Sequence, residues 1–151
     1  MVDHVKPEKR SQIMAAVKGK DTKPEFLIRR LLHAAGYRYR LHRKDLPGRP
    51  DMVLRKYNAI VFIHSCFWHG HGCKRSKNLP KTNTEFWKEK IEKNNRRDTN
   101  NIQLLKSMGW RVCVIWECAL KRQGRIDDEE LVSRISAWLK GRDDYLEIEG
   151  L

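Results

Sequence analysis

Apolar residues recur at helical spacing in three long stretches of the chain. The first begins at a capping box formed by Thr22 and Glu25 and ends at Gly36. The second covers residues 84–107. The third, residues 127–140, begins with four acidic residues, which suit the positive end of the helix dipole. These patterns predict three helices.

Four shorter apolar runs have the pattern of β-strands. Tyrosine and leucine alternate with basic residues over 37–41, which predicts a half-buried strand. Turn-forming residues 46–50 separate it from two further runs, 51–54 and 59–63. The run 59–63 and the later run 110–116 are almost continuously apolar, which favours strands covered on both faces. The predicted order is α, β-β-β, α, β, α.

Length and charge narrow the class of protein. A chain of 151 residues favours one domain, so we expect a basic arm over 1–21 and a single folded domain over 22–151. The formal net charge is +13, from 32 Lys and Arg against 19 Asp and Glu. Such a balance attracts polyanions, of which nucleic acid is the commonest, although a merely soluble basic surface is the alternative.

The sequence carries no membrane or export signal. It lacks any run of about 18 apolar residues, the length that a transmembrane helix needs. The basic N-terminal residues include no apolar segment of the kind found in secretory signals. We therefore expect a cytoplasmic protein, in which four cysteines favour metal binding over disulfides.

Residues 64–73, His-Ser-Cys-Phe-Trp-His-Gly-His-Gly-Cys, concentrate metal-type ligands. Three of them are close enough in sequence to share one zinc ion: Cys66, His71 and Cys73. The best candidate for the fourth ligand is Cys118, just beyond a buried strand, whereas Cys113 lies inside that strand and fits the core. The alternative is reduced thiols beside surface histidines.

Two histidines of this segment, His64 and His69, are not needed for zinc. A neutral histidine can accept a proton from water near neutral pH, although solvated histidines are the alternative. Asp51 opens one strand and His64 ends the next, so a hairpin would bring both to the same end of the sheet. A carboxylate beside a strand-end carbonyl can hold Mg²⁺, whereas most Pro-Asp pairs simply form turns.

Four motifs in order carry a family resemblance: Leu46-Pro-Gly-Arg-Pro-Asp51, Val61-Phe-Ile-His-Ser-Cys-Phe-Trp-His69, Thr84-Glu-Phe-Trp-Lys-Glu-Lys-Ile91 and Gly109-Trp-Arg-Val-Cys-Val-Ile-Trp-Glu-Cys118. From about Lys9 to Leu139 the chain closely resembles the very-short-patch repair (Vsr) mismatch endonucleases. The resemblance implies an α/β fold similar to PD-(D/E)xK nucleases, with a central mixed sheet flanked by helices and a structural zinc site. It also implies a Mg²⁺-dependent nick 5′ to the thymine of a T·G mismatch, the product of 5-methylcytosine deamination.

The resemblance assigns roles to individual residues. Asp51 matches the metal-binding aspartate, and the carbonyl of Ile63 takes the place of the second protein ligand to Mg²⁺. His69 matches the general base and His64 a second catalytic histidine. Two acidic residues match supporting positions of the active site: Glu25 and Asp98.

Further matches concern zinc and DNA. The structural zinc ligands of the family match Cys66, His71, Cys73 and Cys118. The aromatic residues that enter the base stack beside the mismatch match Phe67 and Trp68, and Met14 matches a methionine that approaches from the other groove. Without the resemblance, core packing is the default interpretation of Phe67 and Trp68.

The resemblance also implies a substrate and partners. We expect double-stranded DNA with a T·G mismatch as substrate, a functional link to a cytosine-5 DNA methyltransferase, a MutL-type repair protein as partner, and no membrane. A monomer is expected because the mismatch is asymmetric and one nick needs one site.

The sequence departs from the family at three positions. Ile63 stands where the family often has threonine, and Gly70 and Gly72 stand where some relatives carry histidine.

Two alternatives remain open at this point. One is a restriction-type endonuclease of the same fold that needs no mismatch. The other is a zinc-stabilised DNA-binding module without catalysis, against which the joint presence of Asp51, His64 and His69 speaks.

Overall fold

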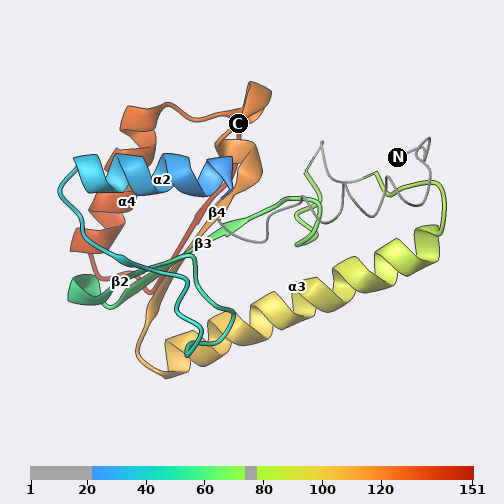
Figure 1. Cartoon of the computed structure of the whole chain (residues 1–151), viewed down its shortest axis with the longest axis horizontal. Coiled ribbons are helices and arrows are strands. Elements are labelled where there is room, and N and C mark those ends of the chain that lie inside the picture. Colours follow the sequence, from blue (N-terminus) through green and yellow to red (C-terminus); the bar gives the residue numbers. More distant parts are fainter. Residues whose placement is uncertain (1–21, 74–77) are drawn as a thin grey trace.

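A computed structural model of the chain describes residues 22–73 and 78–151 (Figure 1). Five strands form one mixed sheet in the order β1-β2-β3-β4-β5. Their bounds are β1 Arg40–Leu41, β2 Met52–Leu54, β3 Ala59–His64, β4 Arg111–Trp116 and β5 Tyr145–Ile148. Strands β1, β2 and β3 pair antiparallel, whereas β3, β4 and β5 pair parallel. The predicted mixed sheet flanked by helices is confirmed.

Three helices cover the two faces of the sheet (Figure 1). They are α2 Lys23–Ala34, α3 Thr84–Ser107 and α4 Asp128–Lys140. Helix α3 connects β3 to β4, and α4 lies between β4 and β5 in the chain, so the parallel strands are joined by helical crossovers. Helix α3 has the bounds predicted from the sequence.

Side chains alternate between two cores, as the period of a strand requires. On one face Val61 and Ile115 pack with Ile28 of α2 and Ile135 of α4. On the other face the neighbouring strand positions pack against Leu105, the one buried residue of α3. The predicted coverage of β3 on both faces is therefore confirmed.

The β2–β3 hairpin sets the position of the active-site strand ends. A short 3₁₀ turn, Arg55–Tyr57, and a left-handed Asn58 (φ 52°) connect the two strands. Met52 is registered with Val61, which places the start of β2 beside the end of β3. Cys113, predicted to be a core residue, is fully buried in β4.

Two details of the predicted elements are wrong. The expected half-buried strand over 37–41 is reduced to the two residues of β1, and Leu41 is 40% exposed. Tyr37 is buried and packs edge-on against Tyr57, but it lies outside the strand, which begins only at Arg40. Strand β5 was not predicted, because only Ile148 of its residues is fully buried.

Some predictions lie outside the described residues. These are the basic arm over 1–21, including Met14, and part of the polar loop that precedes α3.

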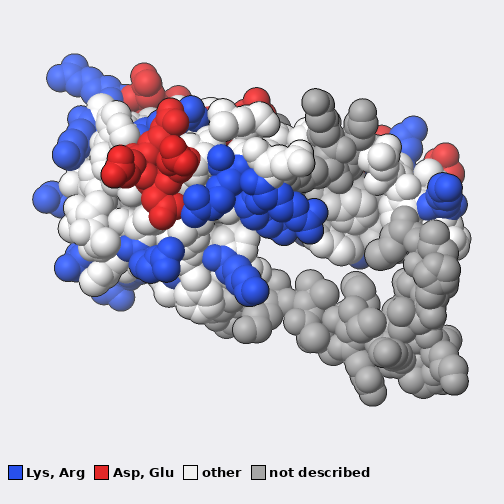
Figure 2. All heavy atoms as spheres, turned by 90° about the horizontal axis from the view of Figure 1, so that it is seen from above, with Lys and Arg blue, Asp and Glu red and all other residues white. Residues whose placement is uncertain are grey.

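Among the helices that are described, none is long and apolar enough to cross a membrane. Figure 2 shows Lys and Arg side chains spread widely over one face, whereas Asp and Glu side chains gather mainly in one patch.

Candidate active site and metal centre

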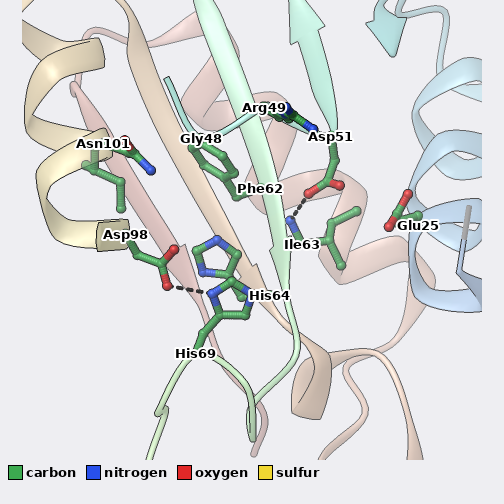
Figure 3. Close-up of a pocket in the computed structure, with 11 residues that line it drawn as sticks. Glu25, Gly48, Arg49, Asp51, Phe62, Ile63, His64, His69, Asp98 and Asn101 are labelled. Carbon is green, nitrogen blue, oxygen red and sulfur yellow. Dashed lines mark hydrogen bonds and ion pairs between the residues drawn. The ribbon is translucent and has the colours of Figure 1, made fainter. Parts of the chain in front are cut away.

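A cavity of about 280 Å³ opens at the end of the sheet where β3 stops (Figure 3). It collects all residues for which the sequence predicts a part in catalysis: Glu25, Asp51, Ile63, His64, His69 and Asp98. They come from α2, the start of β2, the end of β3, the following loop and α3. Six residues that span 74 positions of sequence thus line one space.

Asp51 occupies the floor of this cavity beside β3. Its Oδ2 accepts a hydrogen bond of 2.7 Å from the backbone N–H of Ile63. Burial raises the pKa of Asp51 to about 7, and this hydrogen bond offsets only part of the effect. An ionised carboxylate in such a place is costly unless a cation lies next to it, so the site suits a bound metal ion.

Glu25 contacts two residues that do not themselves line the cavity and that were not predicted from the sequence, Arg29 and His42. Arg29 Nη2 lies 2.9 Å from Glu25 Oε2 and 2.9 Å from His42 Nε2. One ligand atom each from Glu25, His42 and Asp51 lies within 4.8 Å of the others, a spacing that can hold a metal ion. Arg29 reaches Glu25 because it lies four positions later on the same helix, whereas only the fold brings His42 to Glu25.

The two histidines that line the cavity have different surroundings. His69 Nδ1 lies 2.5 Å from Asp98 Oδ2, so the carboxylate fixes the proton on Nδ1 and leaves Nε2 able to accept one. His64 is buried at the end of β3, and burial, with a further contribution from His69, lowers its pKa to about 3. His64 is therefore neutral at physiological pH, and His69 is the residue suited to take up a proton.

Helix α3 holds the loop that carries His69. Asn94 donates a hydrogen bond of 3.1 Å to the carbonyl of Trp68, and Asn95 donates one of 2.9 Å to the carbonyl of His69. Gly70, with φ 66°, approaches the same helix so closely that a Cβ would lie 2.9 Å from Ile91. The loop is thus docked on α3 by its backbone.

The four predicted zinc ligands form a second cluster next to the cavity. One ligand atom from each lies within 4.8 Å of all the others: Cys66, His71, Cys73 and Cys118. Cys118 Sγ is 3.7 Å from His71 Nδ1, close to the roughly 3.6 Å expected for two ligands of one tetrahedral zinc ion. Burial raises the pKa of the Cys66 thiol, so a thiolate there requires an adjacent cation. The donor set fits a closed metal centre.

The two sites use alternate residues of the same loop. His64 and His69 face the cavity, whereas Cys66 and His71 belong to the metal centre. Trp116 of β4 contacts both, because its ring stacks on His71 (4.1 Å between centroids, 8° between planes) and meets His64 edge-on at 5.4 Å.

Aromatic side chains of the loop 64–73 and of α3 form a cluster. The rings of Phe67 and Trp68 meet edge-on at 5.2 Å, and Trp87 of α3 packs against both at 5.9 and 5.6 Å. Lys90 Nζ lies 5.4 Å from the Trp68 ring centre and 5.9 Å from those of Trp87 and Phe86. Trp87 and Lys90 extend the predicted pair Phe67 and Trp68, and a helical tryptophan gave no sequence signal that distinguishes it from core.

A mixed sheet with a buried carboxylate, paired histidines and a Cys/His cluster at one end is the arrangement of a nuclease-like α/β protein with side-chain groups that could hold metal ions. Comparison with known proteins identifies the family. The family model described as DNA mismatch endonuclease Vsr matches residues 2–75. The chain belongs to the Vsr family of DNA mismatch endonucleases and is a DNA endonuclease.

Several curated relatives match most of the chain. It is 44% identical over 132 residues to the DNA mismatch endonuclease Vsr of Escherichia coli, a match covering 87% of this chain and 84% of the relative. It is 48% identical over 127 residues to the type II nicking enzyme V.XorIIP of Xanthomonas oryzae, covering 84% and 93%. It is also 48% identical over 123 residues to the type II nicking enzyme V.NmeAIP of Neisseria meningitidis, covering 82% and 87%.

Proposed function

We propose that this endonuclease nicks one strand of double-stranded DNA 5′ to the thymine of a T·G mismatch, in a reaction that depends on Mg²⁺. The observation that carries the proposal is the cavity in which Asp51, His64 and a His69–Asp98 pair meet beside the aromatic cluster. Relatives named as a mismatch endonuclease and as nicking enzymes support both the substrate and the single-strand cut.

In this proposal, the residues of the cavity have different roles in phosphodiester hydrolysis. Asp51 and the carbonyl of Ile63 would hold Mg²⁺. Glu25, whose carboxylate lies near that of Asp51, would add negative charge beside the ion. When bound, Mg²⁺ supplies charge stabilisation at the phosphate and favours ionisation of water. His69 accepts the proton of the attacking water at Nε2, while Asp98 holds its Nδ1–H.

His64 has a separate part in this proposal. It stays neutral because burial lowers its pKa to about 3, so it does not compete with His69 for the proton. Its ring is stacked on His69, with 3.9 Å between centroids and 2° between planes. We assign His64 to hydrogen bonding at the scissile phosphate and to fixing the plane of His69.

The zinc ion and the aromatic residues serve recognition. Zinc bound by the Cys/His centre would be structural, because four protein ligands leave no position for water. It would hold the loop of Phe67 and Trp68 rigid, so that these rings can enter the base stack where the T·G pair is weakly held. Met14, in the arm outside the described residues, is proposed to approach from the other groove.

The same proposal covers location and partners. The enzyme would act as a monomer on chromosomal DNA in the cytoplasm. Its partner would be a MutL-type repair protein. It would be functionally linked to a cytosine-5 DNA methyltransferase, because deamination of 5-methylcytosine produces the T·G mismatch. Within 22–73 and 78–151, no helix offers a membrane span.

The test is a nicking assay on paired labelled duplexes that differ only in a T·G or a T·A pair, with random flanking sequence. Mg²⁺-dependent nicking of the thymine strand of T·G alone supports the proposal and gives the preferred flanks. Cutting of both duplexes would assign the protein to restriction-type cleavage without a mismatch requirement. Binding without cutting in Mg²⁺ would leave a zinc-stabilised DNA-binding module.

A further inference from the structure

The segment after β5, Glu149-Gly150-Leu151, lies directly against the Cys/His centre. Glu149 Oε2 is 3.0 Å from His71 Nε2, and the backbone N–H of Gly150 donates a hydrogen bond of 3.2 Å to Cys118 Sγ. The N–H of Leu151 donates one of 3.0 Å to the carbonyl of Gly124, which fixes the segment beyond these contacts. None of these three residues was identified from the sequence.

The two ring nitrogens of His71 face different partners. Nδ1 lies on the side of the metal ligands, 3.7 Å from Cys118 Sγ, and Nε2 faces the Glu149 carboxylate. The stacked indole of Trp116 fixes the plane of the ring between them. This arrangement places the proton on Nε2 and leaves the Nδ1 lone pair for a metal ion, and a carboxylate on the far nitrogen makes a ligating histidine more basic.

Gly150 is required for the second contact. A Cβ at this position would lie 2.4 Å from the carbonyl oxygen of Cys118 and 2.8 Å from its carbonyl carbon. Both atoms belong to the backbone, so they cannot move aside as a flexible side chain would. Only glycine lets the chain come close enough for its N–H to reach Cys118 Sγ, where a hydrogen bond stabilises the thiolate.

We infer that Glu149 and Gly150 are positioning residues of the metal centre, which hold His71 and Cys118 in their ligating form and slow the loss of the ion. The inference rests on the zinc ion proposed above for these four ligands. It links the segment after the last strand to the loop of His69 and the aromatic cluster, because His71 and Cys66 belong to that loop.

The experiment measures zinc release from the purified full chain. Zinc content is determined first, and the rate of transfer to a chromophoric chelator is then followed for four variants: Glu149→Ala, Glu149→Gln, Gly150→Ala and, as control, Glu129→Ala. Glu129 is an exposed carboxylate of α4 and is absent from the metal centre. The melting temperature of each variant, recorded alongside, separates loss of zinc from unfolding.

Outer contacts of metal ligands typically change affinity by 10- to 100-fold, and because Glu149 is 63% exposed we expect about 3- to 10-fold faster release in Glu149→Ala. Glu149→Gln keeps an acceptor for Nε2–H and should be intermediate. Gly150→Ala should release zinc at least as fast as Glu149→Ala, and Glu129→Ala at the wild-type rate. In cobalt-loaded protein, the visible spectrum of Glu149→Ala should shift, which a general loss of stability would not cause.

Two results would overturn the inference, and they differ. One zinc per chain in every variant with equal release rates would remove the role of Glu149 and Gly150 but keep the zinc site. A wild-type protein that contains no zinc and takes up none would remove the zinc site itself, and the inference with it.

Discussion

The imidazole of His69 lies parallel to that of His64, with 3.9 Å between ring centroids. The two rings nevertheless differ in charge behaviour. Burial lowers the pKa of His64 to about 3, whereas His69 is partly exposed and has the Asp98 carboxylate 2.5 Å from Nδ1. One histidine of the stack is thus fixed as neutral and the other is equipped to gain a proton.

The Asp98–His69 contact leads to the first prediction. Asp98→Asn removes the charge that stabilises a protonated His69, so the nicking rate should fall by about 10²- to 10⁴-fold. Affinity for the T·G duplex should change little, because the part assigned to Asp98 is to hold His69 through its Nδ1 (Figure 3). Single-turnover nicking and a binding titration measure the two effects. Glu89→Gln, an exposed carboxylate change on the same helix, serves as control; equal rates for both variants would contradict the assigned role.

The ionised Asp51 should lower the stability of the metal-free protein while it provides a ligand for the metal ion. Its pKa is raised from 3.8 to about 7 by burial, so the metal-free protein loses free energy of unfolding as pH rises through this window. Asp51→Asn removes that loss, so in EDTA at pH 7.5 the free energy of unfolding should rise by on the order of 1–3 kcal/mol, and the melting temperature should rise with it. Nicking should be abolished.

Added Mg²⁺ provides the matching control for this prediction. It should raise the melting temperature of the wild-type protein and leave that of Asp51→Asn unchanged, because only the wild type binds the ion. Asp45→Asn, which removes an exposed carboxylate paired with Arg43, should behave like the wild type. A lower melting temperature of Asp51→Asn in EDTA would refute the argument from burial.

Two cysteines only five positions apart should respond differently to mutation. Cys118 belongs to the metal centre, whereas Cys113 is buried in β4 among apolar residues. Cys118→Ala should lose tightly held zinc and several kcal/mol of stability, since metal binding is part of the folding free energy. Cys113→Ala should keep one zinc per chain. Metal analysis after dialysis against a mild chelator decides the point, and zinc loss in both variants would argue against this division.

The aromatic cluster should govern discrimination between T·G and T·A. Stacking of a base on an aromatic ring is worth about 1–3 kcal/mol, so Trp68→Ala should lower affinity for the T·G duplex by roughly 5- to 150-fold. The T·A duplex should be affected less, because its bases are harder to separate. Trp87→Ala should have a smaller effect in the same direction, since Trp87 supports both rings.

The control for the aromatic variants is Leu104→Ala, a change of an exposed apolar residue farther along α3. It should leave both affinities unchanged. If Trp68→Ala weakened binding to the two duplexes equally, the ring would contribute general DNA affinity and not mismatch recognition.

The elements that could be predicted from the sequence are those in which the local pattern of apolar and polar residues reflects their burial in the fold. Helix α3 has a long helical pattern with clear ends, and its bounds Thr84–Ser107 were predicted without error. Strand β3 is apolar throughout because it is covered on both faces. Strand β5 has four residues, of which one is fully buried, and it pairs with a strand more than thirty positions earlier, so nothing local marks it.

The same distinction applies to the functional site. The loop 64–73 contains three of the four candidate zinc ligands in a dense local pattern, and the family resemblance added Glu25 and Asp98. His42 and Glu149 could not be found in this way, because each meets a partner that is distant in the sequence, Arg29 and His71 respectively, and tertiary geometry alone brings them together. Arg29 lies four positions after Glu25 on α2, a spacing from which the ion pair could have been predicted.

The alternation of cavity residues and candidate metal ligands in the loop 64–73 ties the geometry of the two sites together. His69 and His71 lie only two positions apart, and they contact Asp98 and Cys118 respectively. A change in loop length next to them is therefore expected to disturb both contacts. Substitution is restricted as well: a Cβ at Gly72 would meet nothing, but the φ of 74° strains any residue other than glycine. The loop thus couples the geometry of the cavity to that of the Cys/His cluster.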